Sequence, residues 1–468
     1  MTQPDPALPP TLQPAQSPSH AFINGLLELA DADDLEIGAQ VEVEPKKGPK
    51  VWGELVRIRG RGVAEVRWTE GGQTHTYQSK EEDWVSVIDS PKLRALWERE
   101  QKEAAPDGVA WSDTSLSPPL RERLIAGFEA LLASEPPDYH PGSGTIVRDL
   151  VHPSLYCYVE GRTALRPGAT HPAAGEPPDY DLWGRPYEGS RYQWLPTPFH
   201  VAEDGSVEIE GQINNLDRAR HGALYGDLAA LFSAALPQLE SVYGYTRAHP
   251  LLTLREQDCE ADLPEPRATV KRARPPSPLS LRGRTLQVIT KIVEYNLSAG
   301  QEFEGVWHVE GMSHEHILAT SVTVLDRDEA LLGGEIRFQR PYTREEAGQL
   351  FWNVAQCRKR TADELVERGV IPIGSLDTPR GRQFVFPNGH IHKLAKMHVA
   401  PGAERARRRV IVFWLVDPDT RILSTAEVAP QQGVMSRGEA EAHRGSLMEE
   451  RRLHKQSMNV RTVSLCEH

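Results

Sequence analysis

The chain has 468 residues, of which 39% are hydrophobic and 25% charged, and its formal net charge is −13. This length accommodates two or three domains with a sizeable core, and the acidic balance argues against general nucleic-acid binding, which needs a basic surface. The four cysteines form no CxxC pair, so we expect free thiols in a reducing compartment. We see no signal peptide and no apolar run long enough to span a bilayer, so we expect a cytoplasmic protein.

The first part of the chain predicts a tail and a small β module. Residues 1–20 are rich in Pro and Gln and have no periodic apolar face, which predicts a disordered tail. Residues 36–90 hold short alternating runs separated by turns, typical of a small SH3- or Tudor-like antiparallel β-barrel. Its bulky aromatic residues either fill the core or form a cage for a cationic side chain of a protein partner. They are Trp52, Trp68, Tyr77 and Trp84.

Helices and loops are expected in the middle of the chain. A charged helix over residues 91–104 leads to a second helix over residues 117–134, for which Ser117 and Pro118 form a suitable start. Residues 136–191, rich in Pro, Gly and Tyr, predict an ordered loop over a larger body. Apolar residues recur at helical spacing over residues 225–242, which predicts an amphipathic helix that Pro237 kinks or breaks.

Strands dominate the last part of the chain. We predict strands at residues 285–297, 317–325, 335–338, 383–386, 392–399 and 408–416, a helical insertion at 343–368, and a final helix at 436–455. Many strands with one helical layer favour a mainly β, α+β fold. Residues 115–456 would then form a double-stranded β-helix, or jelly roll, buttressed by helices, with a C-terminal tail at 457–468.

A histidine and a carboxylate two positions apart, His308 and Glu310, lie between two strand-like runs. In an extended segment their side chains point to the same face. Two histidines and one carboxylate on one side of a metal are the ligands of non-haem iron(II) oxygenases. A third ligand would come from a strand across the barrel; we favour His392, which opens an apolar strand, over His390, which has the same parity.

The pattern also has simpler explanations. The chain contains 17 histidines, so a histidine and a glutamate two positions apart can arise by chance. His314 and His316 form another pair close to the first one. Spacing alone therefore leaves the metal site as one hypothesis among several.

Several motifs resemble those of one protein family. Residues 307–317 read Trp-His-Val-Glu-Gly-Met-Ser-His-Glu-His-Ile, which is similar to the WHxEGMxNExI signature of the domain of unknown function 4246 family. The resemblance extends roughly over residues 120–456 and leaves the predicted barrel outside. Further similar motifs follow in the expected order, at residues 192–196, 213–216, 286–289, 386–388, 392–393, 413–418, 421–425, 430–432 and 447–451.

This family is similar to iron(II)- and 2-oxoglutarate-dependent dioxygenases built on a double-stranded β-helix. The resemblance implies that His308, Glu310 and His392 are the catalytic iron(II) ligands, with 2-oxoglutarate and O₂ as co-substrates. It implies hydroxylation of an unidentified small molecule or protein, coupled to decarboxylation of 2-oxoglutarate to succinate. His314 and Ile391 depart from the family pattern, so the groups that orient the ligands are expected to differ.

The far carboxylate of 2-oxoglutarate needs a cation, and the planar guanidinium of arginine suits it. In the resembled superfamily this arginine lies on the strand after the distal histidine. Arg408 opens such a strand. Arg409 and Arg421 are alternatives, and Arg421 begins an Arg-x-x-Ser stretch similar to a known binding pattern.

Two other functions remain open at this point. The chain could be a cupin-like metalloprotein that does not use 2-oxoglutarate, or a catalytically silent jelly roll that serves as an interaction module. The sequence contains no Gly-rich phosphate loop, GxSxG elbow or HExxH motif, so it gives no support for nucleotide, serine or zinc-helix hydrolysis.

Overall fold

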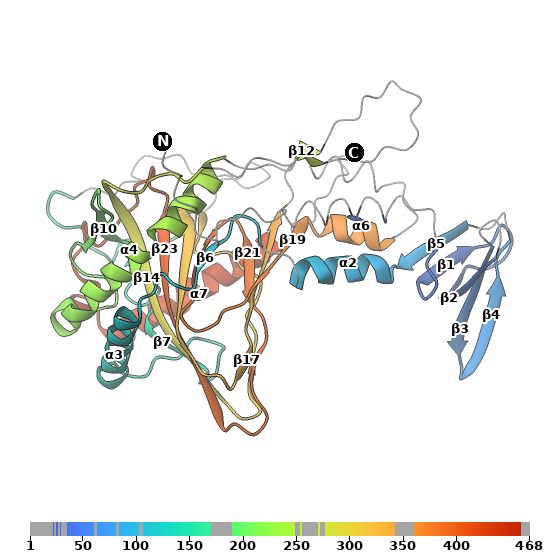
Figure 1. Ribbon diagram of the computed structural model, residues 1–468, viewed down its shortest axis with the longest axis horizontal. Helices are drawn as coiled ribbons and strands as arrows, with labels where there is room; N and C mark the ends of the chain where they lie inside the picture. Colours follow the sequence, from blue (N-terminus) through green and yellow to red (C-terminus); the bar gives the residue numbers. More distant parts are fainter. Residues whose placement is uncertain are drawn as a thin grey trace, which may run out of the picture.

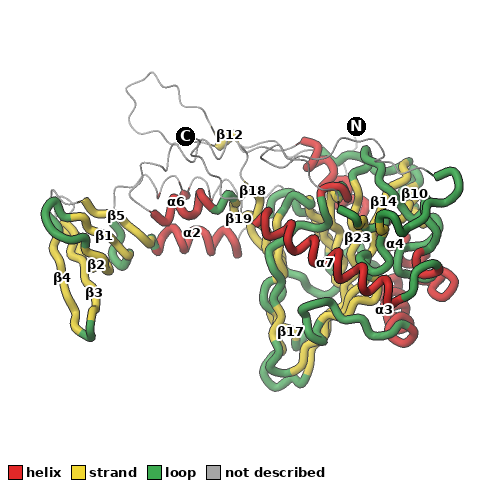
Figure 2. The backbone as a smooth tube through the Cα atoms, turned by 180° about the vertical axis from the view of Figure 1, so that it is seen from behind, coloured by secondary structure: helices red, strands yellow, loops and turns green. Residues whose placement is uncertain are grey.

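The computed structural model describes residues 22, 25, 26, 29, 35–59, 63–80, 84–102, 106–169, 190–248, 253–254, 270–271, 277–341 and 360–459. The predicted tail at residues 1–20, most of the predicted helix at 343–368 and residues 460–468 lie outside the described residues. The described part is mainly β, with antiparallel sheets and a few helices, as predicted (Figures 1 and 2). Among these residues, none of the helices combines the length and apolar character needed to cross a membrane.

A five-stranded antiparallel sheet forms one end of the molecule (Figure 1). Alternate side chains on one face are buried, as the period of a strand requires. Trp52 is 53% exposed and lies on the open face of the sheet. Tyr77 packs against the buried cluster on the opposite face, so these two residues do not line one cage. In spatial order the strands are β4 Gln73–Gln78, β3 Val63–Glu70, β2 Val51–Arg59, β1 Gln40–Glu44 and β5 Trp84–Asp89.

Helix α2, Pro91–Lys102, connects this sheet to the main body (Figure 1). It packs against the strands β18, Ile336–Pro341, and β19, Val370–Leu376. The Gln101 side chain donates a hydrogen bond to the Phe338 carbonyl at 3.0 Å. The helix is therefore anchored to the body by a buried polar contact near its end.

The main body is built on an eight-stranded antiparallel sheet. Its spatial order is β11-β10-β14-β23-β16-β20-β6, and β7 pairs with β14 as well. β7 lies inside residues 136–191, which were predicted to form a loop. Its polar and apolar residues do not alternate, so no strand was predicted there. The strands are β6 Ala110–Ser112, β7 Val147–Val151, β10 Thr197–Val201, β11 Val207–Ile209, β14 Arg284–Ser298, β16 Ile317–Arg327, β20 Gln383–Pro387 and β23 Arg405–Val416.

Two three-stranded sheets form a second layer. The first has the order β19-β18-β21, and β21 is Ile391–Leu394. The second has the order β15-β22-β17; β15 is Glu302–Phe303, β22 is Met397–Val399 and β17 is Leu331–Gly333. The single strand predicted over residues 392–399 is therefore two strands. Between them the Ala395 N–H and the Lys396 carbonyl bond to Glu335 and Gly334, so the chain changes partner there. Short pairings elsewhere are β8 Tyr158–Val159 with β9 Tyr192–Gln193, and β12 Thr253–Leu254 with β13 Val270–Lys271.

Helices cover the outer face of the large sheet. α3, Pro118–Ser134, packs against α4, Arg218–Ala248, and against β16. α4 packs against β16 and β20. α4 continues through Pro237, so the break predicted there does not occur. α7, Arg437–Asn459, crosses the body on the side seen in Figure 2, and α6, Arg360–Glu367, lies beside α2.

The residues of β23 show how the two layers divide the core. Its odd-numbered side chains from Ile411 to Leu415 join the cluster under α3 and α4. Its even-numbered side chains from Val410 to Val416 join a second cluster, between the large sheet and the second layer, which includes Phe338 and Phe386. We call the side of the large sheet that faces the second layer the inner face. Cys157 is a buried free thiol on it, and the other three cysteines lie outside the described residues.

Candidate metal centre

Two histidines from distant parts of the chain face each other in the second layer. His308 and His392 form an antiparallel bridge in which each backbone N–H donates to the other residue's carbonyl, at 3.0 and 2.9 Å. The centroids of their rings are 4.4 Å apart. The Phe386 ring packs edge-on against His392 at 4.6 Å between centroids. Backbone pairing and apolar packing together fix the direction of both imidazoles.

Glu310 completes this group. Its Oε1 lies 3.7 Å from His308 Nε2 and 3.4 Å from His392 Nε2. The Asn388 side chain, in the turn before β21, accepts the Glu310 N–H and donates to the Glu310 carbonyl, both at 2.9 Å. The structure thus brings together the three residues that the sequence singled out, with one donor atom of each within 4.8 Å of the others.

Hydrogen bonds at Nδ1 indicate which ring nitrogen of each histidine carries the proton. His308 Nδ1 lies 2.7 Å from the Val306 carbonyl oxygen, and His392 Nδ1 lies 3.1 Å from that of His390. A carbonyl only accepts, so Nδ1 carries the proton and each neutral ring presents the lone pair of Nε2. Two nitrogen lone pairs and a carboxylate then converge without a proton between them, and a divalent transition metal suits such a donor set.

The protonation states are those that a metal requires. Burial opposes the charge of Glu310, but the adjacent imidazoles of His308 and His392 hold the pKa of its carboxyl well below the usual range. Burial lowers the pKa of His392, and the neighbouring His308 lowers it further. Metal ligands must be an ionised carboxylate and neutral imidazoles. His308 is the most open of the three, with 28% of its side chain exposed, so access is from its side.

The rival histidines do not join the group. His390 Nε2 hydrogen-bonds to the Asp107 carbonyl at 2.6 Å, and burial lowers its pKa to about 4. It lies in the turn before β21, so the alternating side-chain directions of a strand do not extend to it. His314 Nε2 hydrogen-bonds to the Tyr192 carbonyl at 3.0 Å.

Arg408 is a buried cation on the inner face. It is 3% exposed, and in the described part of the chain no carboxylate lies within ion-pair distance of it. Its Nη1 lies 3.7 Å from Met397 Sδ, and its guanidinium lies 5.8 Å from the Tyr295 ring. Its Nε has no hydrogen-bond partner among the described residues. Burial lowers its pKa to about 10. A buried cation without an anion is costly, so this position suits an anionic ligand.

The two alternatives to Arg408 are already paired. Arg409 points to the opposite face of β23, where it bonds to Glu294 at 2.7 Å and Glu129 at 2.6 Å. The side chain of Arg421 is 72% exposed and pairs with Glu427. Neither guanidinium therefore offers an unpaired charge to the inner face.

A second charged cluster lies on the inner face and was not predicted from the sequence. Lys291 of β14 lies opposite Val412, and its Nζ is 3.6 Å from Asp149 Oδ1 of β7. Burial lowers the pKa of Lys291, but the charges of Asp149, Tyr295 and Glu310 raise it above its usual value, so it stays cationic. No motif marks these residues; only the pairing of β7 with β14 brings them together.

This cluster includes two further histidines, and its hydrogen bonds differ from those of the first group. Asp149 Oδ2 lies 2.9 Å from His140 Nδ1 and 3.8 Å from His152 Nε2. His152 Nδ1 accepts the Ser154 N–H at 3.1 Å, so the proton of neutral His152 is on Nε2, facing Asp149. The spacing would admit a metal. The proton on His152 Nε2 instead faces the Asp149 carboxylate, to which His140 Nδ1 is hydrogen-bonded.

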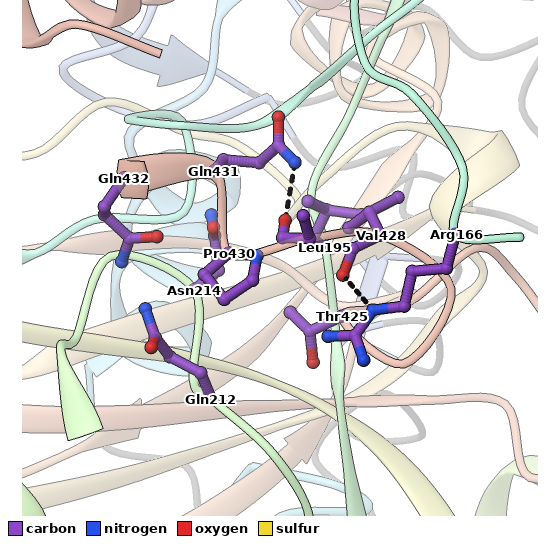
Figure 3. A pocket seen from close by; sticks show the side chains of 10 residues that line it. Arg166, Leu195, Gln212, Asn214, Thr425, Val428, Pro430, Gln431 and Gln432 are labelled. Carbon is purple, nitrogen blue, oxygen red and sulfur yellow. Dashed lines mark hydrogen bonds between the residues drawn. The ribbon is translucent and has the colours of Figure 1, made fainter. Parts of the chain in front are cut away.

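A small cavity lies elsewhere, where the loop after β23 meets Leu195 (Figure 3). Arg166 Nε donates to the Val428 carbonyl at 2.8 Å, and Gln431 Nε2 donates to that of Ala429 at 2.6 Å. The cavity has room for about one water molecule. It suits a bound water. The amide side chains that line it are those of Gln212, Asn214, Gln431 and Gln432.

Several solved structures are similar to this chain at low identity. An oxidoreductase of the 2OG-Fe(II) oxygenase family from Burkholderia pseudomallei is 13% identical, with a TM-score of 0.18; the match covers 31% of this chain and 47%, about half, of that one. A prolyl hydroxylase from Trichoplax adhaerens, in complex with a hypoxia inducible factor peptide, is 9% identical over 66% of this chain and 84% of that one, with a TM-score of 0.26. The Fe(II)/(alpha)ketoglutarate-dependent dioxygenase TqaL is 11% identical over 69% and 86%, with a TM-score of 0.29.

At these TM-scores the likenesses define neither the fold nor the chemistry of this chain, and no curated protein matches its sequence. The sequence does match the family described as "Protein of unknown function (DUF4246)" over residues 73–439. The match begins at β4, so it includes the last two strands of the N-terminal sheet, which the motifs had left outside. Because it spans well over half of the residues, the chain belongs to the DUF4246 family.

Proposed function

We propose that this protein is an iron(II)- and 2-oxoglutarate-dependent oxygenase that hydroxylates an unidentified small molecule or protein. The observation that supports this is the convergence of His308 Nε2, His392 Nε2 and the Glu310 carboxylate, with the Nδ1 protons bound to backbone carbonyls. Two histidines and one carboxylate leave the remaining metal positions open for co-substrate and O₂.

The arrangement of the sheets fits the same proposal. The large sheet and the two smaller ones enclose the inner face, as the two layers of a double-stranded β-helix over residues 115–456 would. The five-stranded sheet of residues 36–90 would be a separate SH3- or Tudor-like module that binds a protein partner. The metal group would then lie in the mouth of the jelly roll, within the second layer.

Each residue of the site has a role in this proposal. His308, Glu310 and His392 would hold the ion, and Asn388 keeps the Glu310 backbone in place. Phe386 and Phe338 pack beside His392 and keep water from that side. Iron(II) held there would supply a binding position for 2-oxoglutarate and the activation of O₂ for hydroxylation of a C–H bond.

Arg408 is the proposed partner of the far carboxylate of 2-oxoglutarate. It lies on the inner face and is not neutralised by a carboxylate of the described chain. Arg421, one of the two predicted alternatives, is less suitable because it pairs with Glu427 at the surface. Lys291 is a second cation on the inner face, but Asp149 accompanies it.

Anaerobic titration with iron(II), with and without 2-oxoglutarate, tests the proposal. We expect a charge-transfer band that needs both additions, is lost in His308→Ala and remains in His390→Gln, because His390 bonds to Asp107 instead. Iron binding without this band would indicate a cupin-like metalloprotein that does not use 2-oxoglutarate. A wild-type protein that binds no iron(II) would contradict the proposal and favour an interaction module.

A further inference from the structure

The C-terminal helix α7 reaches the loop that carries Glu310 through a buried ion pair. Arg451 of α7 is 5% exposed, and its Nη2 donates to Oε1 of Glu315, which is 0% exposed. The Arg451 guanidinium also lies 3.9 Å from the centroid of the Trp194 ring. Glu315 ends the 3-10 turn η3, Ser313–Glu315, a few residues after Glu310.

Glu315 fixes the backbone of this loop. Its Oε2 accepts the Met312 N–H at 2.8 Å, and its Oε1 accepts the Trp194 N–H at 2.6 Å. Gly311, between Glu310 and Met312, has φ +65°, and a Cβ there would lie 2.7 Å from Glu315 Oε2. The chain therefore turns closely over the carboxylate immediately after the metal ligand, at a position that only glycine fits well.

Arg451 balances the charge of the buried Glu315 carboxylate. Among the described residues, Arg451 is the cation paired with this carboxylate, and Arg451 Nε and Nη1 have no hydrogen-bond partner of their own. A charge buried this completely is stable only when it is paired. Both carboxylate oxygens act as acceptors, Oε2 for the Met312 N–H and Oε1 for the Trp194 N–H.

We propose that Arg451 and Glu315 are positioning residues that set the metal affinity of the His308–Glu310–His392 group. This inference rests on the metal site of the proposed function. With Arg451 in place, Glu315 holds Met312, and the Gly311 turn directs Glu310 toward the histidines. Without Arg451, the buried Glu315 carboxylate loses its charge partner and must move, and a metal ligand tolerates displacements of only about 0.5 Å.

Two substitutions on α7 separate this role from simple docking of the helix. Arg451→Gln removes the contact with Glu315, whereas Arg444→Gln removes the contacts of Arg444 Nη1 with the two Asp138 oxygens, at 2.6 and 2.7 Å. Both arginines anchor the same helix, but Asp138 lies outside the loop of residues 310–315. Anaerobic titration with iron(II) alone gives the affinity, and thermal unfolding gives the stability of each variant.

We expect Arg451→Gln to bind iron(II) about tenfold or more weakly, as loss of the groups that orient metal ligands typically does. Arg444→Gln is expected to keep the wild-type affinity even where its stability falls. Arg451→Lys keeps the charge and should restore most of the affinity. Equal affinities in Arg451→Gln and Arg444→Gln would overturn the proposal, whether both are weakened or neither is.

A double variant keeps the test valid if Arg451→Gln does not fold. Glu315→Gln with Arg451→Met removes both charges, which a protein interior tolerates better than one unpaired charge. The amide that Glu315→Gln introduces has a donor in place of one acceptor oxygen, so we expect weak iron(II) binding in a folded protein. Wild-type affinity in this variant would contradict the inference. A wild-type chain that binds no iron(II) would contradict the proposed function itself, before any variant is compared.

Discussion

Arg408 stands apart from the neighbouring arginines of β23 because no carboxylate of the described chain neutralises it. We predict that Arg408→Gln weakens 2-oxoglutarate binding about 100-fold, since losing one partner of a buried charge pair typically costs 2–5 kcal/mol. Iron(II) affinity should stay near that of the wild type, because Arg408 is not among the three converging ligands. Titrating 2-oxoglutarate into the anaerobic iron(II) protein measures the change.

Arg407→Gln is the matched control for this variant. Arg407 precedes Arg408 but pairs with Asp326 at 3.7 Å, with 39% of its side chain exposed. Exposed pairs contribute little, so 2-oxoglutarate affinity should be unchanged. If the two variants lost 2-oxoglutarate affinity equally, the role of Arg408 would have to be given up, and Lys291 would become the next candidate.

At the scale of the elements, the contact of α4 with the large sheet depends on Phe232. Its ring is fully buried and lies 5.0 Å from that of Phe199 and 5.5 Å from that of Phe413. We predict that Phe232→Ala lowers the free energy of unfolding by about 3–5 kcal/mol, because it leaves a cavity between helix and sheet. Chemical denaturation measures this loss. Phe232→Leu should lose clearly less, and equal losses would mean that the site collapses around either side chain.

The elements also show what the sequence could predict. The runs that became β14, β16 and β23 are long and apolar, and their predicted bounds agree with the structure to within about three residues. β7 is short, has no alternation and lies in a Pro- and Gly-rich region, so no local signal marked it. Its residue Asp149 reaches Lys291 only through the pairing with β14.

The metal group could be anticipated for a similar reason. His308 and Glu310 are two positions apart, so their common direction follows from an extended chain alone. The choice between His390 and His392 depended on where β21 begins, which local sequence does not determine. Which arginine is left without an acidic partner depends on the folded positions of Glu294, Glu129 and Glu427. Glu294 and Glu129 are far from Arg409 in sequence, and Glu427 follows the end of β23.

For the whole molecule, buried neutral histidines predict the response to acid. Burial lowers the pKa of His390 to about 4 and that of His152 well below its usual value. An unfolded chain would protonate both near pH 6.5, so it binds more protons than the folded protein below that pH. The free energy of unfolding should therefore be fully retained above pH 6.5 and fall as the pH decreases toward about 4.

His390 alone should account for about 3 kcal/mol of this loss, from the difference between its two pKa values. Denaturant unfolding between pH 7 and 4.5 measures the slope, and His390→Gln should make it shallower whatever its effect at pH 7. An unchanged slope in this variant would show that His390 is protonated in the folded protein or does not contribute.

The bridge between His308 and His392 has a consequence for chain topology. The two residues are 392 − 308 = 84 positions apart, yet their backbones pair directly. An ion held by both would act as a cross-link that closes this long loop, which spans β16 to β20 and part of the large sheet. An ion that binds only the folded chain would add about 2.7 kcal/mol at a free concentration 100 times its dissociation constant. The same three side chains would then serve as ligands and as the cross-link that closes this loop.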